Sequence, residues 1–117
     1  MGNDIQRFET SRRMSKAVVH GNTVYLCGQV GIRGDSIEKQ TQEALNRVQT
    51  LLKSVGSDKS RMLQVIIWLK SMEHFDAMNR VWEDWLPEGA APARACGQSA
   101  LDNEELLVEF TVTAALK

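Results

Sequence analysis

Arg94 is the side chain in this sequence best suited to binding a small anion. It stands in the segment Pro92-Ala93-Arg94-Ala95-Cys96, where an extended stretch begins and the neighbouring side chains are small. A guanidinium presents a planar fork of N–H groups that grips a carboxylate through two hydrogen bonds. Arg94 could therefore bind a carboxylate ligand, although the residues alone favour an ordinary surface ion pair.

Glu109 is the second candidate, because it lies in a segment of otherwise apolar and β-branched residues, 106–116. A carboxylate in such a place must be solvated, paired or hydrogen-bonded, since burial of a lone charge is costly. It could hold or activate a water molecule as a general base. The alternative is an ion pair with a lysine or arginine across an interface.

The two cysteines, Cys27 and Cys96, both fall in strand-like segments. Cys96 comes two residues after Arg94 and should face the same side of its strand. No histidine is near it in the sequence, so an inert, half-buried and reduced thiol is favoured over a reactive one. With His20 and His74 the cysteines form no paired ligand spacing, and no phosphate-binding or nucleophile motif occurs. We therefore expect no zinc site.

Length and charge limit the class of protein. The 117 residues suffice for one core, so residues 1–117 are expected to form a single domain. A formal net charge of −1 gives no basic field for nucleic acid. No apolar run of about 18 residues is present, so no membrane span is expected. The first eight residues lack the apolar stretch of a secretion signal, which predicts a cytoplasmic protein.

Hydrophobic periodicity predicts strands over 5–9, 17–20, 23–29, 62–69, 93–99 and 106–116, and helices over about 35–55 and 74–86. Gly21-Asn22 suits the turn between the second and third of these strands. Asp35, with Glu38 three residues on, is expected to cap the first helix, and Gly56 to follow its end. The order β-β-α-β-α-β-β, with a further strand in front, predicts an α+β fold. Two helices cannot cover both faces of one mixed sheet, so both should pack on the same face.

Alternation along the strands leaves the second face of the sheet partly apolar. Over 62–69 the expected core set is Leu63, Val65, Ile67 and Leu69, and the opposite set is Met62, Gln64, Ile66 and Trp68. Over 106–116 the core set is Leu106, Val108, Phe110, Val112 and Ala114, opposite Leu107, Glu109, Thr111 and Thr113. Over 23–29, Val24 and Leu26 point inward, and Thr23, Tyr25, Cys27 and Gln29 outward. Such a face predicts packing against copies of the same chain, with a monomer as the alternative.

Four segments in this order resemble the RidA/YjgF family, the reactive intermediate deaminases. Residues 24–30 (VYLCGQV) are similar to its early strand, and Phe75, Met78-Asn79 and Trp82 to its second helix. Pro92-Ala93-Arg94-Ala95-Cys96 and Leu107-Val108-Glu109-Phe110 resemble its arginine segment and its last strand. The resemblance covers nearly the whole chain.

The resemblance implies a chorismate-mutase-like fold, assembled as a homotrimer around a central β-barrel with ligand clefts between subunits. It implies hydrolysis of reactive enamines or imines to 2-oxo acids and ammonia without a metal or cofactor. Carried over to this sequence, Arg94 binds the substrate carboxylate and Glu109 positions the attacking water. Four further residues line the cleft, namely Cys96, Cys27, Gly28 and Asn79. Arg94 could come from a different subunit than its neighbours in the cleft.

The sequence departs from the family pattern at several positions. Met14 stands in the place of a tyrosine, Cys27 in that of a serine or threonine, Gly97 in that of a larger apolar residue, and Asp102-Asn103 in that of Leu-Pro. Residues 13–20 resemble a less characterised branch of the superfamily instead. The alternative function is therefore a non-enzymatic module that binds a small 2-oxo acid or amino acid and regulates a partner protein.

Overall fold

The computed structural model describes residues 4–117; the first three residues of the amino-terminal stretch considered above lie outside this range. The helices are α1 (Ile37–Ser54) and α2 (Phe75–Trp85), with short 3₁₀ turns at Lys59–Arg61 and Met72–His74. The strands are β1 (Ile5–Phe8), β2 (Ala17–His20), β3 (Thr23–Leu26), β4 (Gln29–Val30), β5 (Met62–Leu69), β6 (Ala93–Gln98) and β7 (Val108–Ala115). The predicted elements are all present.

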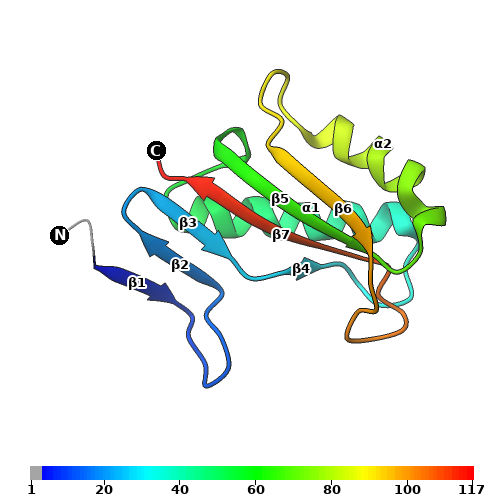
Figure 1. The fold of residues 1–117 in the computed structure, drawn as a ribbon, viewed down its shortest axis with the longest axis horizontal. Coiled ribbons are helices and arrows are strands. Elements are labelled where there is room, and N and C mark those ends of the chain that lie inside the picture. The colour runs from blue at the N-terminus through cyan, green and yellow to red at the C-terminus, as the bar shows by residue number, and fades with distance from the viewer. Residues whose placement is uncertain (1–3) are drawn as a thin grey trace.

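Within the described residues the strands form one seven-stranded sheet in the order β1-β2-β3-β7-β5-β6, and β4 also pairs with β7. The pair β5–β6 is parallel and the others are antiparallel. Both helices lie on the same side of this mixed sheet, with α1 running behind it and α2 beside β6 (Figure 1). The α+β arrangement expected from the order of the elements is confirmed.

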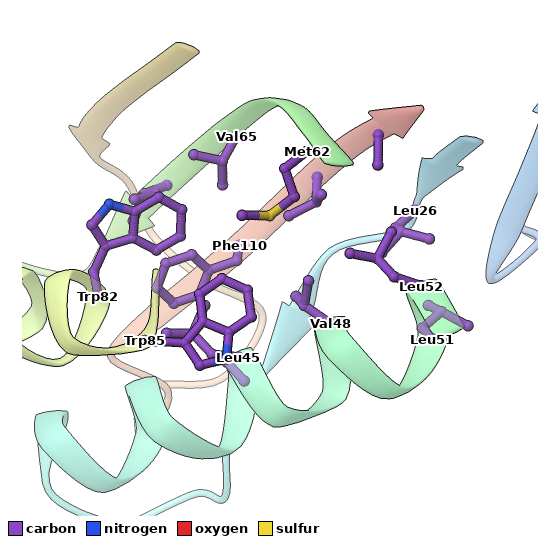
Figure 2. Packing of buried hydrophobic residues seen from close by; sticks show 14 of the residues in the cluster. Leu26, Leu45, Val48, Leu51, Leu52, Met62, Val65, Trp82, Trp85 and Phe110 are labelled. Carbon is purple, nitrogen blue, oxygen red and sulfur yellow. The ribbon is translucent and has the colours of Figure 1, made fainter. Parts of the chain in front are cut away.

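Aromatic rings join α2 to the middle of the sheet. Trp82 stacks on Phe110 of β7 with ring centroids 5.8 Å apart and planes 12° apart, and Trp85 lies 5.8 Å from Trp82. Figure 2 shows these rings above Leu45 of α1, with Val48 of the same helix beside Trp85. Large aromatic side chains bury much apolar area, so this cluster fixes α2 against β7.

Helix α1 begins one residue later than expected. Ser36, not Asp35, is the N-cap, and its hydroxyl accepts a hydrogen bond from the backbone N–H of Lys39. A serine satisfies this otherwise unpaired donor as well as an aspartate does. The predicted end is confirmed, because Gly56 follows the C-cap with a φ of +87°.

Two β-bulges correct the expected strand faces. In β5, Met62 pairs with Ala114 but Gln64 pairs with Thr113, so Leu63 is an extra residue. Leu63 is consequently 49% exposed and Met62 is buried, the reverse of the expectation. A bulge adds one residue to one strand and exchanges the faces of the residues on one side of it.

The second bulge interrupts the strand expected over 23–29. Tyr25 pairs with Thr113 and Gln29 with Phe110, so three residues between Tyr25 and Gln29 oppose two on β7. Because Phe110 is wholly buried beneath the helices, its partner Gln29 also points to the helix side. The expectation that Gln29 faces outward with Tyr25 is therefore wrong.

Opposite the helices the sheet has an open face formed by Tyr25, Gln64, Ile66, Trp68, Glu109, Thr111 and Thr113. Tyr25 is 49% exposed and Trp68 39% exposed, although both are large aromatic residues. Monomeric proteins rarely leave such side chains together in water.

Candidate functional site

Arg94 lies at the edge of the sheet, where it is held by the first turns of α2. Its Nη1 donates a hydrogen bond of 2.7 Å to Oδ1 of Asn79, and its Cζ lies 5.8 Å from the centre of the Phe75 ring. Phe75 and Asn79 are four residues apart and so share one face of the helix. An amide partner orients the guanidinium without cancelling its charge, and the exposed side chain remains able to meet an anion.

Cys96 points to the same side of β6 as Arg94, as its spacing predicts. It is half-buried and packs against the main core. Burial raises the pKa of this thiol, and the positive charge of Arg94 offsets the rise only in part. Cys96 therefore fits the expectation of an inert, half-buried thiol. These four residues, Arg94, Asn79, Phe75 and Cys96, are called the Arg94 group below.

Glu109 lies directly against Gly28, in the bulge between β3 and β4. A Cβ built on Gly28 would overlap Oε2 of Glu109 and would lie only 2.7 Å from its Cδ. The carboxylate occupies this space because residue 28 has no side chain. Half-burial raises the pKa of Glu109, and the negative charge of Asp102 raises it further. A carboxylate with a raised pKa is better suited to exchange a proton near neutral pH.

Cys27 completes this second cluster. Its sulfur and its carbonyl oxygen both accept from Nε2 of Gln29 at 3.2 Å, and its N–H donates to the carbonyl of Lys16. Burial raises the pKa of this thiol too, while the charge of Lys16 and the hydrogen bond from Gln29 lower it and Glu109 raises it. Glu109, Gly28 and Cys27 are called the Glu109 group below.

One copy of the chain does not bring the two groups together. Val65 and Ile67 of β5 pair with Arg94 and Cys96 of β6, and Ile67 pairs with Phe110 of β7 on the buried side. Glu109 pairs with Trp68 instead, and so belongs to the open face. Arg94 and Glu109 thus project from opposite faces of the sheet. Neither lines the hollows of about 470 Å³ and 390 Å³ on the surface of the chain.

The structure shows the surroundings of three positions that depart from the family pattern. Met14 is 48% exposed in a loop closed by Ser11, whose N–H and hydroxyl both donate to the Met14 carbonyl. A Cβ on Gly97 would lie 3.2 Å from Cζ3 of Trp68, so the indole fills the space that a side chain at 97 would need. Asp102 contributes its charge to Glu109.

Sequence reasoning gave no binding role to Phe75 and Gln29. The four-residue spacing of Phe75 and Asn79 on one helix was the available signal for the first. Nothing in the sequence signalled the second, because the bulge decides the direction of Gln29.

Among residues 4–117 no three or more side chains of the His, Cys, Asp or Glu type gather as metal ligands. In the same range no helix has both the length and the apolar character needed to cross a bilayer.

Comparison with known proteins gives a match over nearly the whole chain. Residues 4–116 match the family model described as Endoribonuclease L-PSP. The RutC family protein YoaB of Escherichia coli is 35% identical over 113 residues, which are 96% of this chain and 98% of that protein. A RutC family protein of Haemophilus ducreyi is 32% identical over 113 residues, 96% of this chain and 97% of that one.

Solved structures agree with the fold. A member of the YjgF protein family from Neisseria meningitidis superposes with a TM-score of 0.96 at 35% identity, covering 100% of this chain and 98% of that one. A Pseudomonas aeruginosa protein superposes with a TM-score of 0.94 at 42% identity, covering 97% and 100%.

Proposed function

Because this chain belongs to the endoribonuclease L-PSP family, the RidA/YjgF family of the RutC and YjgF proteins, we propose that it hydrolyses small 2-imino and 2-enamino acids. The products would be 2-oxo acids and ammonia. The observation that carries the proposal is the setting of Arg94, a charged fork oriented by the neutral Asn79 and left accessible at a sheet edge. A planar carboxylate is the ligand that matches this fork.

The reaction needs one further group, and Glu109 supplies it. Arg94 binds the substrate carboxylate, and Glu109 takes a proton from a water molecule whose oxygen bonds to C2 of the imine. This proton passes to the nitrogen and gives a carbinolamine. The remaining hydroxyl proton then passes through Glu109 to the same nitrogen, the C2–N bond breaks, and ammonia leaves as the C2=O carbonyl forms. Imines hydrolyse spontaneously in water, so holding both reactants in near-attack geometry is a sufficient contribution from the protein. The proposed reaction involves no metal or organic cofactor.

The catalytic site is proposed to form between copies of the chain. A small substrate cannot contact Arg94 and Glu109 of one copy, because these side chains leave opposite faces of the sheet. The Arg94 group of one copy and the Glu109 group of the next would meet in a closed ring of identical contacts. The partly apolar open face supports such self-association, and we propose a cytoplasmic homotrimer with clefts between its subunits.

The name of the family model also raises RNA as a substrate. The net charge of −1 does not favour it, since binding to nucleic acid draws most of its affinity from basic groups that neutralise phosphates. The Arg94 group offers one guanidinium on an amide partner, which fits one carboxylate better than a polyanion.

The test is release of 2-oxo acid from 2-aminoacrylate or 2-iminopropanoate generated in situ. The wild type should accelerate it, and Arg94→Ala should abolish the acceleration while leaving the oligomer intact. Arg80→Ala, at an exposed arginine of the same helix that holds Asn79, is the matched control and should keep the activity. An Arg94→Ala variant as fast as the wild type refutes the proposal.

A second candidate is a binding module that holds a 2-oxo acid or an amino acid without turnover. The residue at position 14 favours it, because Met14 stands in the place of the family's tyrosine and its thioether cannot donate a proton. This function predicts that a small 2-oxo acid raises the melting temperature of the wild type but not of Arg94→Ala, with no imine consumed by either.

A further inference from the structure

A polar hollow lies apart from the Arg94 group, between α1 and the segment that joins β1 to β2, and it adjoins the Glu109 group because Gln29 of its lining donates to Cys27. Its volume is about 470 Å³, within the range of about 300–1,000 Å³ usual for small-molecule sites. The charged residues that line it are Glu9, Lys16, Glu43 and Arg47, with the amides of Gln29 and Asn46 between them. In this hollow, carboxylates and cations face the same space. The Arg94 group, in contrast, offers a cation without a carboxylate.

Each wall of the hollow carries one ion pair. On the loop side, Nζ of Lys16 lies 3.5 Å from Oε1 of Glu9, and both side chains are more than half exposed. On the helix side, Nε of Arg47 donates to Oε2 of Glu43 at 2.9 Å, and its Nη1 donates to the carbonyl of Val30 at 2.8 Å. Exposed ion pairs contribute little to stability, so the pair of Lys16 and Glu9 is not explained as a support of the fold.

Arg47 is nevertheless fixed in place. Its two hydrogen bonds anchor the guanidinium to α1 and to β4 at once, and use only part of its five N–H donors. A cation held in this way retains donors for a carboxylate, while Glu43 and Glu9 offer acceptors to an ammonium group. The lining charges sum to zero, which favours a ligand with both signs of charge over a simple anion or cation.

The loop wall is held in a conformation that its sequence does not favour. Glu9 has a φ of +49°, the one positive φ of a non-glycine residue within residues 4–117. Such backbone is costly for a residue with a Cβ, and it occurs preferentially at ligand sites. Here it places Glu9 beside Lys16 at the rim of the hollow. The bulge between β3 and β4 also brings a polar side chain into the hollow, because it turns Gln29 away from the open face.

From these observations we infer that the hollow binds a free α-amino acid in its zwitterionic form. The carboxylate would meet Arg47 and Lys16, the ammonium Glu43 and Glu9, and an aliphatic side chain would rest on Leu51, which also lines the hollow. The site is separate from the Arg94 group, so its existence does not depend on the proposed deaminase activity.

Calorimetric titration with three matched probes tests this inference. L-Leucine carries both charges, 4-methylpentanoate lacks the amine, and 3-methylbutylamine lacks the carboxylate. Leucine should bind the full chain at least about tenfold more tightly than either of the others, a difference of about 1.4 kcal/mol. Equal binding of the three, or no leucine binding up to roughly 10 mM, overturns the inference.

Variants locate the binding. Lys16→Gln and Glu43→Gln should each weaken leucine binding about tenfold or more, and neither removes a buried side chain. Lys53→Gln, an exposed residue in the last turn of the same helix, is the matched control and should leave it unchanged. Arg94→Ala should also leave it unchanged; loss of binding in that variant with retention in Lys16→Gln would place leucine at the Arg94 group and overturn the assignment.

Discussion

Arg94 and Glu109 leave opposite faces of one sheet, although only β5 separates the two strands that carry them. The register fixes this relationship, since Val65 pairs with Arg94 while Trp68 pairs with Glu109. Residues of odd separation on β5 point to opposite sides. A reaction that needs both side chains therefore needs two copies of the chain, and this requirement can be tested directly.

Mixing two inactive variants should restore activity. The Arg94→Ala variant retains Glu109, and the Glu109→Gln variant retains Arg94. An interface between one copy of each variant can therefore combine the two intact residues. When equal amounts are unfolded together and refolded, random assembly gives an intact pair at half times half, or about a quarter, of the interfaces. Imine hydrolysis at about a quarter of the wild-type rate is expected. A mixture as inactive as its components would mean that both residues act within one copy.

Gly28→Ala should impair the reaction by displacing Glu109. The new Cβ would lie 2.7 Å from Cδ of Glu109, so the carboxylate must move, and the free end of this side chain is flexible enough to do so. We expect a drop in kcat of about tenfold or more with a small change in melting temperature. In the background of Glu109→Ala the overlapping atoms are gone, so there Gly28→Ala should cost no stability. Equal costs in both backgrounds would contradict this account.

Glu109 should make the chain less stable as the pH rises. Burial and Asp102 raise the pKa of this carboxyl, so the folded state holds the proton more tightly than the unfolded state does. Its favourable contribution is present below the unfolded pKa and is lost as the pH rises through the raised folded pKa. Glu109→Gln should therefore gain melting temperature relative to the wild type between about pH 4 and pH 7. A relative loss would indicate a cation beside the ionised carboxylate, as in an ion pair across an interface.

A charge on the open face should dissociate the oligomer. Ile66 pairs with Thr111 and Ala95 near the middle of this face, and Ile66→Lys would place an ammonium where a second copy is proposed to pack. Sedimentation velocity should give a monomer for this variant and a trimer for the wild type, with the secondary structure of both intact. Glu83→Lys on the exposed side of α2 is the control and should remain a trimer. A wild-type monomer at micromolar concentration refutes the proposed assembly.

The positions and types of the elements could be read from the sequence. Three local patterns show this: the apolar stripe of α1, the aromatic face of α2, and the alternation of Val108, Phe110 and Val112 in β7. Each pattern arises because the element buries one apolar face. The shared side of Arg94 and Cys96 followed from the same alternation. The family followed from the order of short segments along the chain.

Tertiary structure alone decided which residues meet. The exposure of Leu63, the inward turn of Gln29 and the place of Glu109 against Gly28 all depend on bulges, and a bulge is set by pairing with a distant strand. An extra residue exchanges the faces of the side chains beyond it without leaving a trace in local hydrophobicity. The sequence by itself thus determined the sheet, the helices and the candidate residues. The pairing of strands far apart in the chain decided that Arg94 and Glu109 lie on opposite faces, because register is a property of two segments and not of either one.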